Sequence, residues 1–383
     1  MQGNEIKGTL INQRLYSLDA LRGFDMFWII GADEVFHELA KSTGSPFWVS
    51  ISTQFTHPSW NGFHFYDLIF PLFLFLAGVS TPYSIGRSLS EGKTKHQLLL
   101  RVIKRGLILV LLGLIYNNGL QLRPIADIRF SSVLGRIGIA YMLANIIYLY
   151  AKEKMQLIWF FGLLIGYWLI LKFTSAPGFA MGDLTMEGNF ASYVDRSILP
   201  GKLSLKIHDT VGFFNNIPAI STALAGIITG IQLKKTNIDK KKKTWVMAIC
   251  GLACLLIAQI WNLDFPINKN MWSSSFVMHT VGLDCLILAC IMYWIDFRNQ
   301  TAGTYFFKVF GRNPLPIYLL SELLVTILYT IQVGDIPLYQ WIYQNIFIYA
   351  GDYLASLLFA ITYMLLCWSV GYIFDKNKVY IRV

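Results

Sequence analysis

Long apolar stretches alternate with short polar ones along the whole chain. A helix needs about 20 apolar residues to cross a bilayer, and it satisfies its own backbone hydrogen bonds there. The aromatic segment Pro337–Tyr349 is predicted to be a further interfacial or short helix. The pattern therefore predicts an all-α polytopic membrane protein with about ten transmembrane helices. The chain is expected to form a single domain over 1–383, with a cytoplasmic N-terminus over 1–22 and spans over about 24–374. The predicted spans are Phe24–Leu39, Phe65–Ile85, Leu107–Leu120, Val133–Tyr150, Leu157–Phe173, Phe214–Leu233, Trp245–Trp261, Phe276–Ile295, Pro314–Ile331 and Tyr353–Phe374.

Composition agrees with this class of protein. Hydrophobic residues make up 55% of the chain and charged residues 14%, whereas charged residues are about 25% of a typical soluble domain. The mean hydropathy is +0.50. Segment 1–13 is polar, so no cleavable signal peptide is expected. The five cysteines lie in apolar stretches without paired spacing, so we expect neither a disulfide framework nor a metal site.

Positive charge is unevenly distributed between alternate polar segments. If the N-terminus is cytoplasmic, most of the 32 Lys and Arg residues fall in cytoplasmic segments. Because such an excess sets the orientation of membrane proteins, we predict a multi-pass protein of the cytoplasmic (inner) membrane with both termini in the cytoplasm. The run Lys240–Lys243 is interpreted as an anchor that faces anionic lipid. The lipid bilayer is thus an expected partner and nucleic acid is not.

The most unusual stretch is Thr56–Phe75, in which polar and aromatic residues pass directly into an apolar span. Ionisable groups beside hydrocarbon are costly and tend to be functional, although a single histidine in an outer loop is more often simply solvated. Asp33 is expected at the same membrane depth as His57, where a carboxylate would orient the imidazole and favour a general base. The predicted catalytic residues are His57 and Asp33, and the predicted substrate-binding residues here are Trp60, Asn61 and Asp67.

Further polar groups lie at both predicted membrane faces. The turn before the eighth span offers Asn268, Lys269 and Trp272, which are predicted to bind substrate. On the basic face, arginine side chains could receive phosphates, but anchoring explains them equally well. The predicted cofactor-binding residues are Arg105, Arg312 and Asn313 on this face, together with Arg129 and Arg136 near the outer face. Within the sixth span, the small residues of Ala223–Gly230 predict close helix packing.

These motifs resemble the heparan-α-glucosaminide N-acetyltransferase family of transmembrane acyltransferases. The similar segments are Arg14–Gly23, His57–Gly62, Tyr66–Pro71, Ile128–Tyr141, Asn216–Ala219 and Asn268–Ser273. The resemblance implies acetyl transfer from cytoplasmic acetyl-CoA, as co-substrate, to a glucosamine-type amino sugar on the extracytoplasmic side. It also implies that His57 is essential and, by analogy, that the protein is a homodimer. Asp33 stands where the family has asparagine, and Gly135 stands where a glutamine is expected.

The same resemblance implies a bacterial-type member without the luminal domain of the lysosomal proteins. Its histidine is expected either to deprotonate the acceptor directly or to carry the acetyl group first. Asn61, Lys269 or a backbone N–H would stabilise the oxyanion. The sequence leaves both routes open.

A competing hypothesis is an amino-sugar transporter, which the lack of paired broken helices in two halves disfavours. A third hypothesis is a membrane scaffold, which the polar groups around His57 disfavour.

Overall fold

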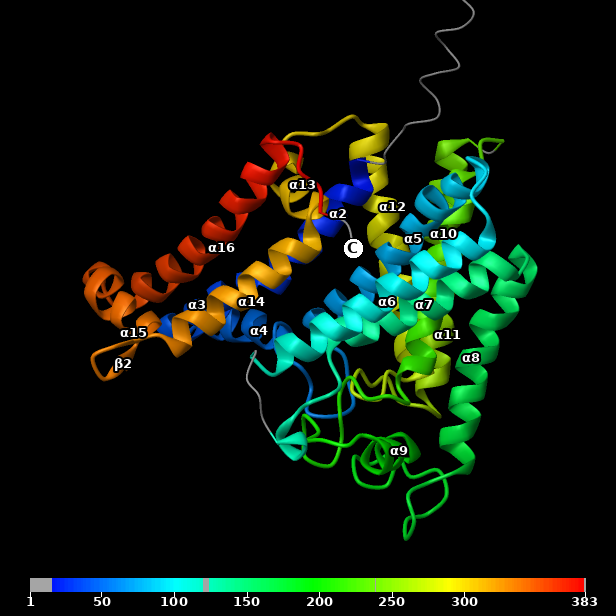
Figure 1. The fold of residues 1–383 in the computed structure, drawn as a ribbon, viewed down its shortest axis with the longest axis horizontal. Helices are drawn as coiled ribbons and strands as arrows, with labels where there is room; N and C mark the ends of the chain where they lie inside the picture. The colour runs from blue at the N-terminus through cyan, green and yellow to red at the C-terminus, as the bar shows by residue number, and fades with distance from the viewer. Residues whose placement is uncertain (1–15, 120–123, 238, 382–383) are drawn as a thin grey trace, which may run out of the picture.

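The protein is described here by a computed structural model that covers residues 16–119, 124–237 and 239–381 (Figure 1). The predicted N-terminal segment up to residue 15 and Leu120, the end of the third predicted span, lie outside the described residues. The larger helices are α2 (Tyr16–Phe27), α3 (Glu34–Thr43), α4 (Pro46–Gln54), α5 (Ile69–Ser90), α6 (Lys95–Asn117), α7 (Val133–Tyr150), α8 (Glu153–Phe173), α9 (Phe190–Ile198), α10 (Asn216–Lys234), α11 (Lys240–Asn262), α12 (Ser274–Met292), α13 (Thr304–Arg312), α14 (Pro314–Thr330), α15 (Leu338–Ile342) and α16 (Asp352–Lys376).

Short elements join these helices. They are the π-helical turns η1 (Trp28–Ala32), η4 (Tyr293–Phe297) and η5 (Tyr343–Phe347), the 3₁₀ turns η2 (Phe65–Leu68), η3 (Ile125–Asp127) and η6 (Ile348–Ala350), and the antiparallel pair β1 (Gln332–Val333) and β2 (Ile336–Pro337). The all-α class is therefore confirmed, because the two-residue strands are the only sheet in the described part of the chain. The predicted interfacial helix over Pro337–Tyr349 coincides with α15, η5 and the first residues of η6.

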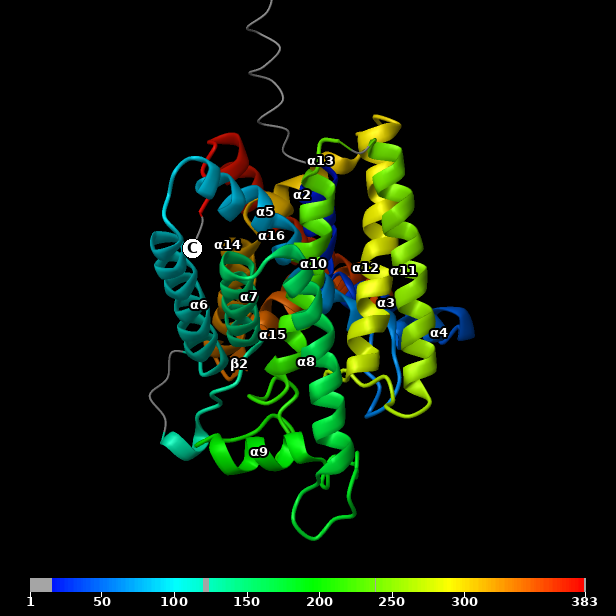
Figure 2. The ribbon, with the colours of Figure 1, turned by 90° about the vertical axis from the view of Figure 1, so that its right-hand side faces the viewer.

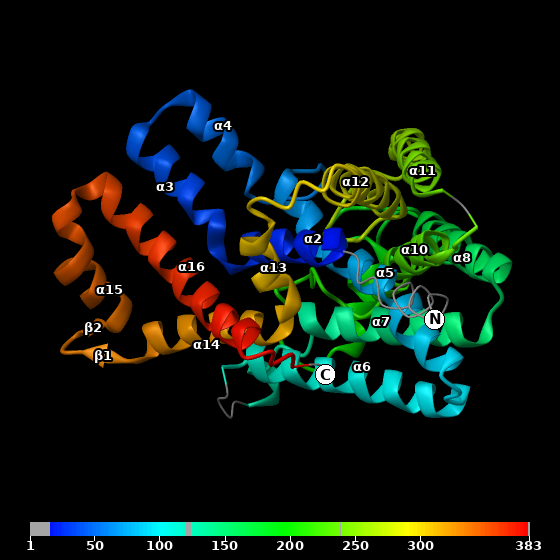
Figure 3. The ribbon, with the colours of Figure 1, turned by 90° about the horizontal axis from the view of Figure 1, so that it is seen from above.

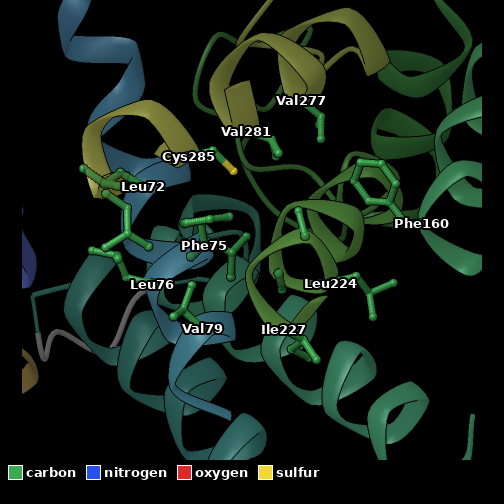
Figure 4. Close-up of a cluster of buried hydrophobic side chains, with 14 of the residues drawn as sticks. Leu72, Phe75, Leu76, Val79, Phe160, Leu224, Ile227, Val277, Val281 and Cys285 are labelled. Atoms are coloured by element: carbon green, nitrogen blue, oxygen red, sulfur yellow. The ribbon is translucent and has the colours of Figure 1, made fainter. Parts of the chain in front are cut away.

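The helical bundle is built around the contact between α5 and α10. Cβ atoms at Gly78, Gly226 and Gly230 would lie 2.2, 2.0 and 2.4 Å from backbone oxygens of the facing helix, so only glycine permits this approach. The predicted close packing of the sixth span is confirmed. Helices α8 and α12 complete the core, whose central side chains point toward one another in Figure 4: Leu72, Phe75, Leu76, Val79, Phe160, Leu224, Ile227, Val277, Val281 and Cys285.

The first predicted span, Phe24–Leu39, is not one straight helix. Helix α2 continues into η1 and then breaks at Gly31, whose φ of +117° lies in a region that favours glycine. Helix α3 leaves in a new direction and packs against α4 and α16. Seen from above, α3, α4, α14, α15 and α16 form an outer group beside the main bundle (Figure 3). The break therefore turns the chain away from the bundle before it returns through the loop that carries His57.

Seven helices of the described chain are long and apolar enough to cross a membrane: Phe65–Ser90, Val133–Tyr150, Glu153–Phe173, Asn216–Lys234, Lys240–Asn262, Ser274–Phe297 and Leu354–Lys376. Helix α14 is apolar but shorter. The protein is thus a multi-pass membrane protein, and the count of about ten spans stays a prediction.

The two ends of the bundle differ in character. The turns α5–α6, α7–α8 and α10–α11 lie at the end remote from α9 (Figure 1). These turns carry lysine and arginine residues, including Lys95, Lys152 and the run Lys240–Lys243. The opposite end holds α9 and the long connections, which cap the bundle in Figure 2.

Candidate functional site

His57 and Asp67 form the centre of the candidate site. The Nδ1 atom of His57 lies 2.7 Å from the Oδ1 atom of Asp67. The carboxylate is fully buried, whereas 46% of the imidazole side chain is exposed. When the proton of the neutral ring is on Nδ1, beside the carboxylate, the lone pair lies on Nε2. This arrangement is the orienter–base pair that proton transfer requires.

The local fold holds Asp67 in place. Residues Phe65–Leu68 form the 3₁₀ turn η2 at the start of α5, and the Asp67 carboxylate accepts a hydrogen bond from the backbone N–H of His64 at 2.9 Å. Tyr66 stacks on the imidazole with ring centroids 5.2 Å apart. The Asp67 carboxylate therefore has two contacts: it caps the turn at the start of α5 and also binds the imidazole.

Lys269 is the second charged group at the imidazole. Its Nζ atom lies 2.9 Å from Nε2 of His57 and 3.4 Å from Oδ1 of Asp67. Burial lowers the pKa of Lys269 to about 8, while the neighbouring Asp67 carboxylate acts in the opposite direction. The side chain is thus an ammonium at neutral pH that can donate a hydrogen bond to a developing negative charge.

A tightly bonded turn positions Lys269. The buried side chain of Asn268 accepts from the N–H of Met271 at 2.8 Å and donates to Asn61 at 3.0 Å. Tyr167 donates its hydroxyl to the Met271 carbonyl at 2.7 Å. These bonds stabilise the left-handed backbone of Trp272, whose φ is +51°.

Asp33 has a different partner from the one predicted. The carboxylate in contact with His57 is that of Asp67, whereas Asp33 lies close to the Tyr66 side chain. Tyr66 lies between Asp33 and the imidazole, since its ring stacks on that of His57. The structure therefore places Asp33 beside Tyr66, and Tyr66 beside the imidazole.

A cavity of about 320 Å³ opens beside the imidazole and is mostly apolar. It runs between α2, α5, α7 and α14 and is lined by Met26, Ile29, His57, Tyr66, Ile69, Phe70, Phe73, Val133, Leu134, Ile137, Thr210, Val211, Lys269, Asn270, Trp272, Leu315, Tyr318 and Glu322. Of the predicted site residues, His57, Lys269 and Trp272 line it directly. Its apolar walls suit a flexible acyl or thioester-bearing chain, and the polar groups Tyr66 and Lys269 contact the imidazole.

Other predicted substrate-binding residues fix the loops around this cavity. Trp60 donates its indole N–H to the Leu184 carbonyl at 2.9 Å, and its ring meets that of His208 edge-on at 5.1 Å. The ring of His208 is also within 3.1 Å of the Asn270 carbonyl. Burial lowers the pKa of His208 to about 4, so this ring is neutral at physiological pH and donates one N–H to Asn270.

The predicted cofactor-binding residues fall into separate places. Arg129 makes two hydrogen bonds to Asp209 at 3.0 and 3.3 Å in the layer that holds α9. Arg136 is buried with its guanidinium 4.7 Å from the centre of the Trp272 ring, in cation–π geometry behind the cavity wall. Both therefore lie on the His57 side of the protein. The structure does not bring them together with the remaining three.

Those three are Arg105, Arg312 and Asn313. Arg105 donates to the Tyr141 hydroxyl at 3.2 Å. Arg312 is ion-paired with Asp375, and Asn313 accepts a hydrogen bond from the N–H of Ile381 at 3.0 Å. A separate cavity of about 490 Å³ lies at the basic end of the bundle, lined by four lysines, Lys95, Lys152, Lys234 and Lys235, together with Pro82, Leu89, Tyr148, Leu149, Tyr150, Ala151, Glu153, Gln156 and Ile231.

Sequence reasoning missed Glu322 and Tyr318 in α14, which line the cavity with His57. The signal was present, because Glu322 is an acidic residue within an apolar run. Among the described residues, no group of three or more His, Cys, Asp or Glu side chains is arranged to hold a metal ion.

The fold and the site together define a multi-pass helical membrane protein with an imidazole–carboxylate pair at the mouth of a cavity. The chain belongs to the heparan-alpha-glucosaminide N-acetyltransferase family: residues 14–263 match the family model for "Heparan-alpha-glucosaminide N-acetyltransferase, catalytic". This region includes His57 and Asp67.

Two curated relatives extend the similarity beyond that region. The chain is 26% identical over 364 residues to the heparan-alpha-glucosaminide N-acetyltransferase of Homo sapiens, covering 81% of this chain and 53% of the relative. It is 27% identical over 365 residues to the protein of the same name from Mus musculus, covering 81% of this chain and 54% of the relative. The chain thus spans about half the length of the curated relatives it matches.

Proposed function

We propose that this protein transfers the acetyl group of acetyl-CoA to the amine of a glucosamine-type amino sugar. The observation that carries the proposal is the His57–Asp67 pair, with its Nδ1–Oδ1 distance of 2.7 Å, at a cavity that extends into the helical bundle. The family match supports the reaction class. The apolar cavity suits the pantetheine arm, which would bring the thioester to the imidazole.

The chemistry follows from the contacts of His57. Asp67 holds Nδ1–H, so Nε2 can accept a proton from the acceptor nitrogen as it attacks the thioester carbonyl. The same proton then passes to the leaving thiolate of coenzyme A. Lys269 would turn from Nε2 toward the carbonyl oxygen and stabilise its negative charge. An acetyl group carried first on His57 is the alternative route, and labelling of protein by radioactive acetyl-CoA without acceptor distinguishes the two.

The remaining parts of the proposal concern the cell. We place the donor on the basic face and the acceptor on the α9 face, in the inner membrane with both termini cytoplasmic, because the basic turns lie remote from α9. A homodimer belongs to the proposal on the family resemblance alone.

Substitution of the central pair tests the function. In reconstituted vesicles, His57→Ala is expected to abolish acetyl transfer to glucosamine, and Asp67→Asn to lower kcat by roughly 10²–10⁴-fold, the usual contribution of a positioned acid–base group. His96→Ala is a matched control, because this exposed histidine starts α6 at the basic end. Full turnover by the His57 variant, folded as judged by its elution and melting, would remove His57 from its role.

A further inference from the structure

Glu322 is a carboxylate without a cationic partner at the cavity. It lies in the middle of α14, half-buried, and lines the same cavity as His57. None of the ion pairs within the described residues includes Glu322. An acidic side chain in an apolar helix is costly and normally serves a ligand or a partner. The carboxylate is therefore suited to bind a cation that the described residues do not supply.

Two tyrosines lie beside this carboxylate. The Tyr116 side chain in α6 comes close to Glu322. The ring of Tyr116 packs against that of Tyr318, one turn before Glu322, with ring centroids 5.8 Å apart. Glu322 thus lies where α6 and α14 pack together. A phenol carries no charge at neutral pH, so the carboxylate keeps its affinity for a cation.

The charges of the cavity are arranged asymmetrically. Lys269 is already paired, because its Nζ atom lies 3.4 Å from the Asp67 carboxylate and 2.9 Å from the imidazole. Glu322 is the only acidic side chain among the described residues that line the cavity. An amine acceptor would be oriented by these charges, with its cation at Glu322, while Lys269 serves the carbonyl oxygen of the thioester.

We propose that Glu322 binds the ammonium group of the acceptor and takes its first proton. This inference rests on the proposed acetyl transfer and adds the residue that selects an amine. A sugar amine enters as R–NH₃⁺, a form that has no lone pair and cannot attack a thioester. A carboxylate both attracts this form and accepts a proton from it, so the nucleophile is generated where it is bound.

The two protons of the reaction then follow separate paths. The carboxylate of Glu322 takes the first proton and leaves R–NH₂. The nitrogen lone pair attacks the thioester carbonyl and forms the C–N bond, while His57 accepts the second proton at Nε2. The C–S bond breaks and His57 returns that proton to the thiolate. The products are the amide, the thiol of coenzyme A and one proton on Glu322, which water removes.

Two assays of Glu322→Gln test this role. The first is the KM for glucosamine, which is expected to rise about tenfold or more, as for the loss of one charge-assisted hydrogen bond. The second is competition by glucose, which has a hydroxyl in place of the amine. The wild type should bind glucosamine in preference to glucose, and Glu322→Gln should lose most of that preference. Glu38→Gln is the matched control, because Glu38 pairs with Lys41 on α3, away from the cavity.

The pH dependence supplies a readout that a purely structural residue would not change. The ratio of wild-type to Glu322→Gln activity should fall as pH rises toward the pKa of the acceptor amine, because more acceptor then arrives as R–NH₂. The titratable groups facing Glu322 are tyrosines, Tyr66, Tyr116, Tyr318 and Tyr363, which are neutral in this range.

The outcomes separate this inference from the function it rests on. If the wild type transfers no acetyl group to glucosamine, the proposed function fails. If the wild type is active and Glu322→Gln keeps its KM, its preference for glucosamine and its pH profile, the role of Glu322 is overturned. Should Glu322→Gln not fold, Glu322→Asp serves instead. Its shorter carboxylate is expected to raise KM while retaining the preference for glucosamine, and an unchanged KM would contradict the proposal.

Discussion

The residues that contact His57 determine what its imidazole can do. Their depth in the membrane could be predicted from the sequence, but their position within the plane of the membrane could not. The order of residues along a span gives a level in the bilayer, so Asp33 was expected beside the imidazole. The actual neighbour is Asp67, because η2 turns that carboxylate back toward the preceding loop at an Nδ1–Oδ1 distance of 2.7 Å. Glu322 was not predicted as a site residue, because its position in the plane of the membrane could not be predicted either. Its partners depend on how α14 packs beside α6 and α7, which no local pattern specifies.

Lys269 gives the site a defined pH dependence. Burial lowers the pKa of Lys269 to about 8, with Asp67 opposing and Arg136 reinforcing the shift. The ammonium is therefore present below pH 8 and lost above it, so kcat at saturating acceptor should decline as pH rises through about 8. Lys269→Met should lose this decline and lower kcat by roughly 10²–10³-fold, the effect of removing one oxyanion donor.

A pH–rate profile of three variants checks this assignment. Lys269→Arg should move the decline to higher pH, since guanidinium stays charged. Lys172→Met is the control, because Lys172 is an exposed lysine at the end of α8 that pairs with Asp264. An unchanged alkaline decline in Lys269→Met would assign it to another group.

At the scale of elements, the close packing of α10 was the most predictable feature, although its partner α5 was not predicted. Small residues at helical spacing indicate a surface where two backbones can meet, and the glycines of α10 do meet the backbone of α5. The break at Gly31 was less predictable, because the apolar run continues through it and only the backbone torsion distinguishes it. Helix α13 was also missed, since its nine residues are too few to span a bilayer.

A matched pair of glycine substitutions tests the helix contact. A Cβ atom at Gly226 would lie 2.0 Å from the Phe75 carbonyl oxygen, so Gly226→Ala must push α5 and α10 apart. We expect a loss of stability of about 1–3 kcal/mol, typical of overpacked cores. Gly162→Ala in α8 is the control, because a Cβ atom there meets nothing within 4 Å and alanine is the better helix former. Thermal melting of the purified variants in detergent measures both, and equal melting temperatures would contradict the predicted contact.

For the whole molecule, hydropathy predicted the helices, and which of them cross the membrane stays a prediction. Helix α6 begins with lysine and arginine residues, and α14 is short, so neither meets the criteria of length and composition that seven other helices satisfy. The distribution of charge distinguishes the two ends of the bundle, which hydropathy does not. The basic turns gather at one end of the bundle and α9 at the other, so the two faces are chemically distinct (Figure 2).

This polarity leads to a prediction about the sides from which the two substrates act. Acetyl-CoA carries several charges and cannot cross a bilayer, so it must reach the thioester position through the protein. In sealed vesicles, product should form only when acetyl-CoA is on the side of Lys240–Lys243 and glucosamine is on the side of α9. Protease cleavage at the exposed residues 240–242 reports the orientation of each preparation. Reversal of the two compartments should abolish product, and addition of detergent should restore it. Product formed with both substrates confined to the α9 side would refute transfer across the membrane, and uptake of labelled glucosamine without acetyl-CoA would instead support a transporter.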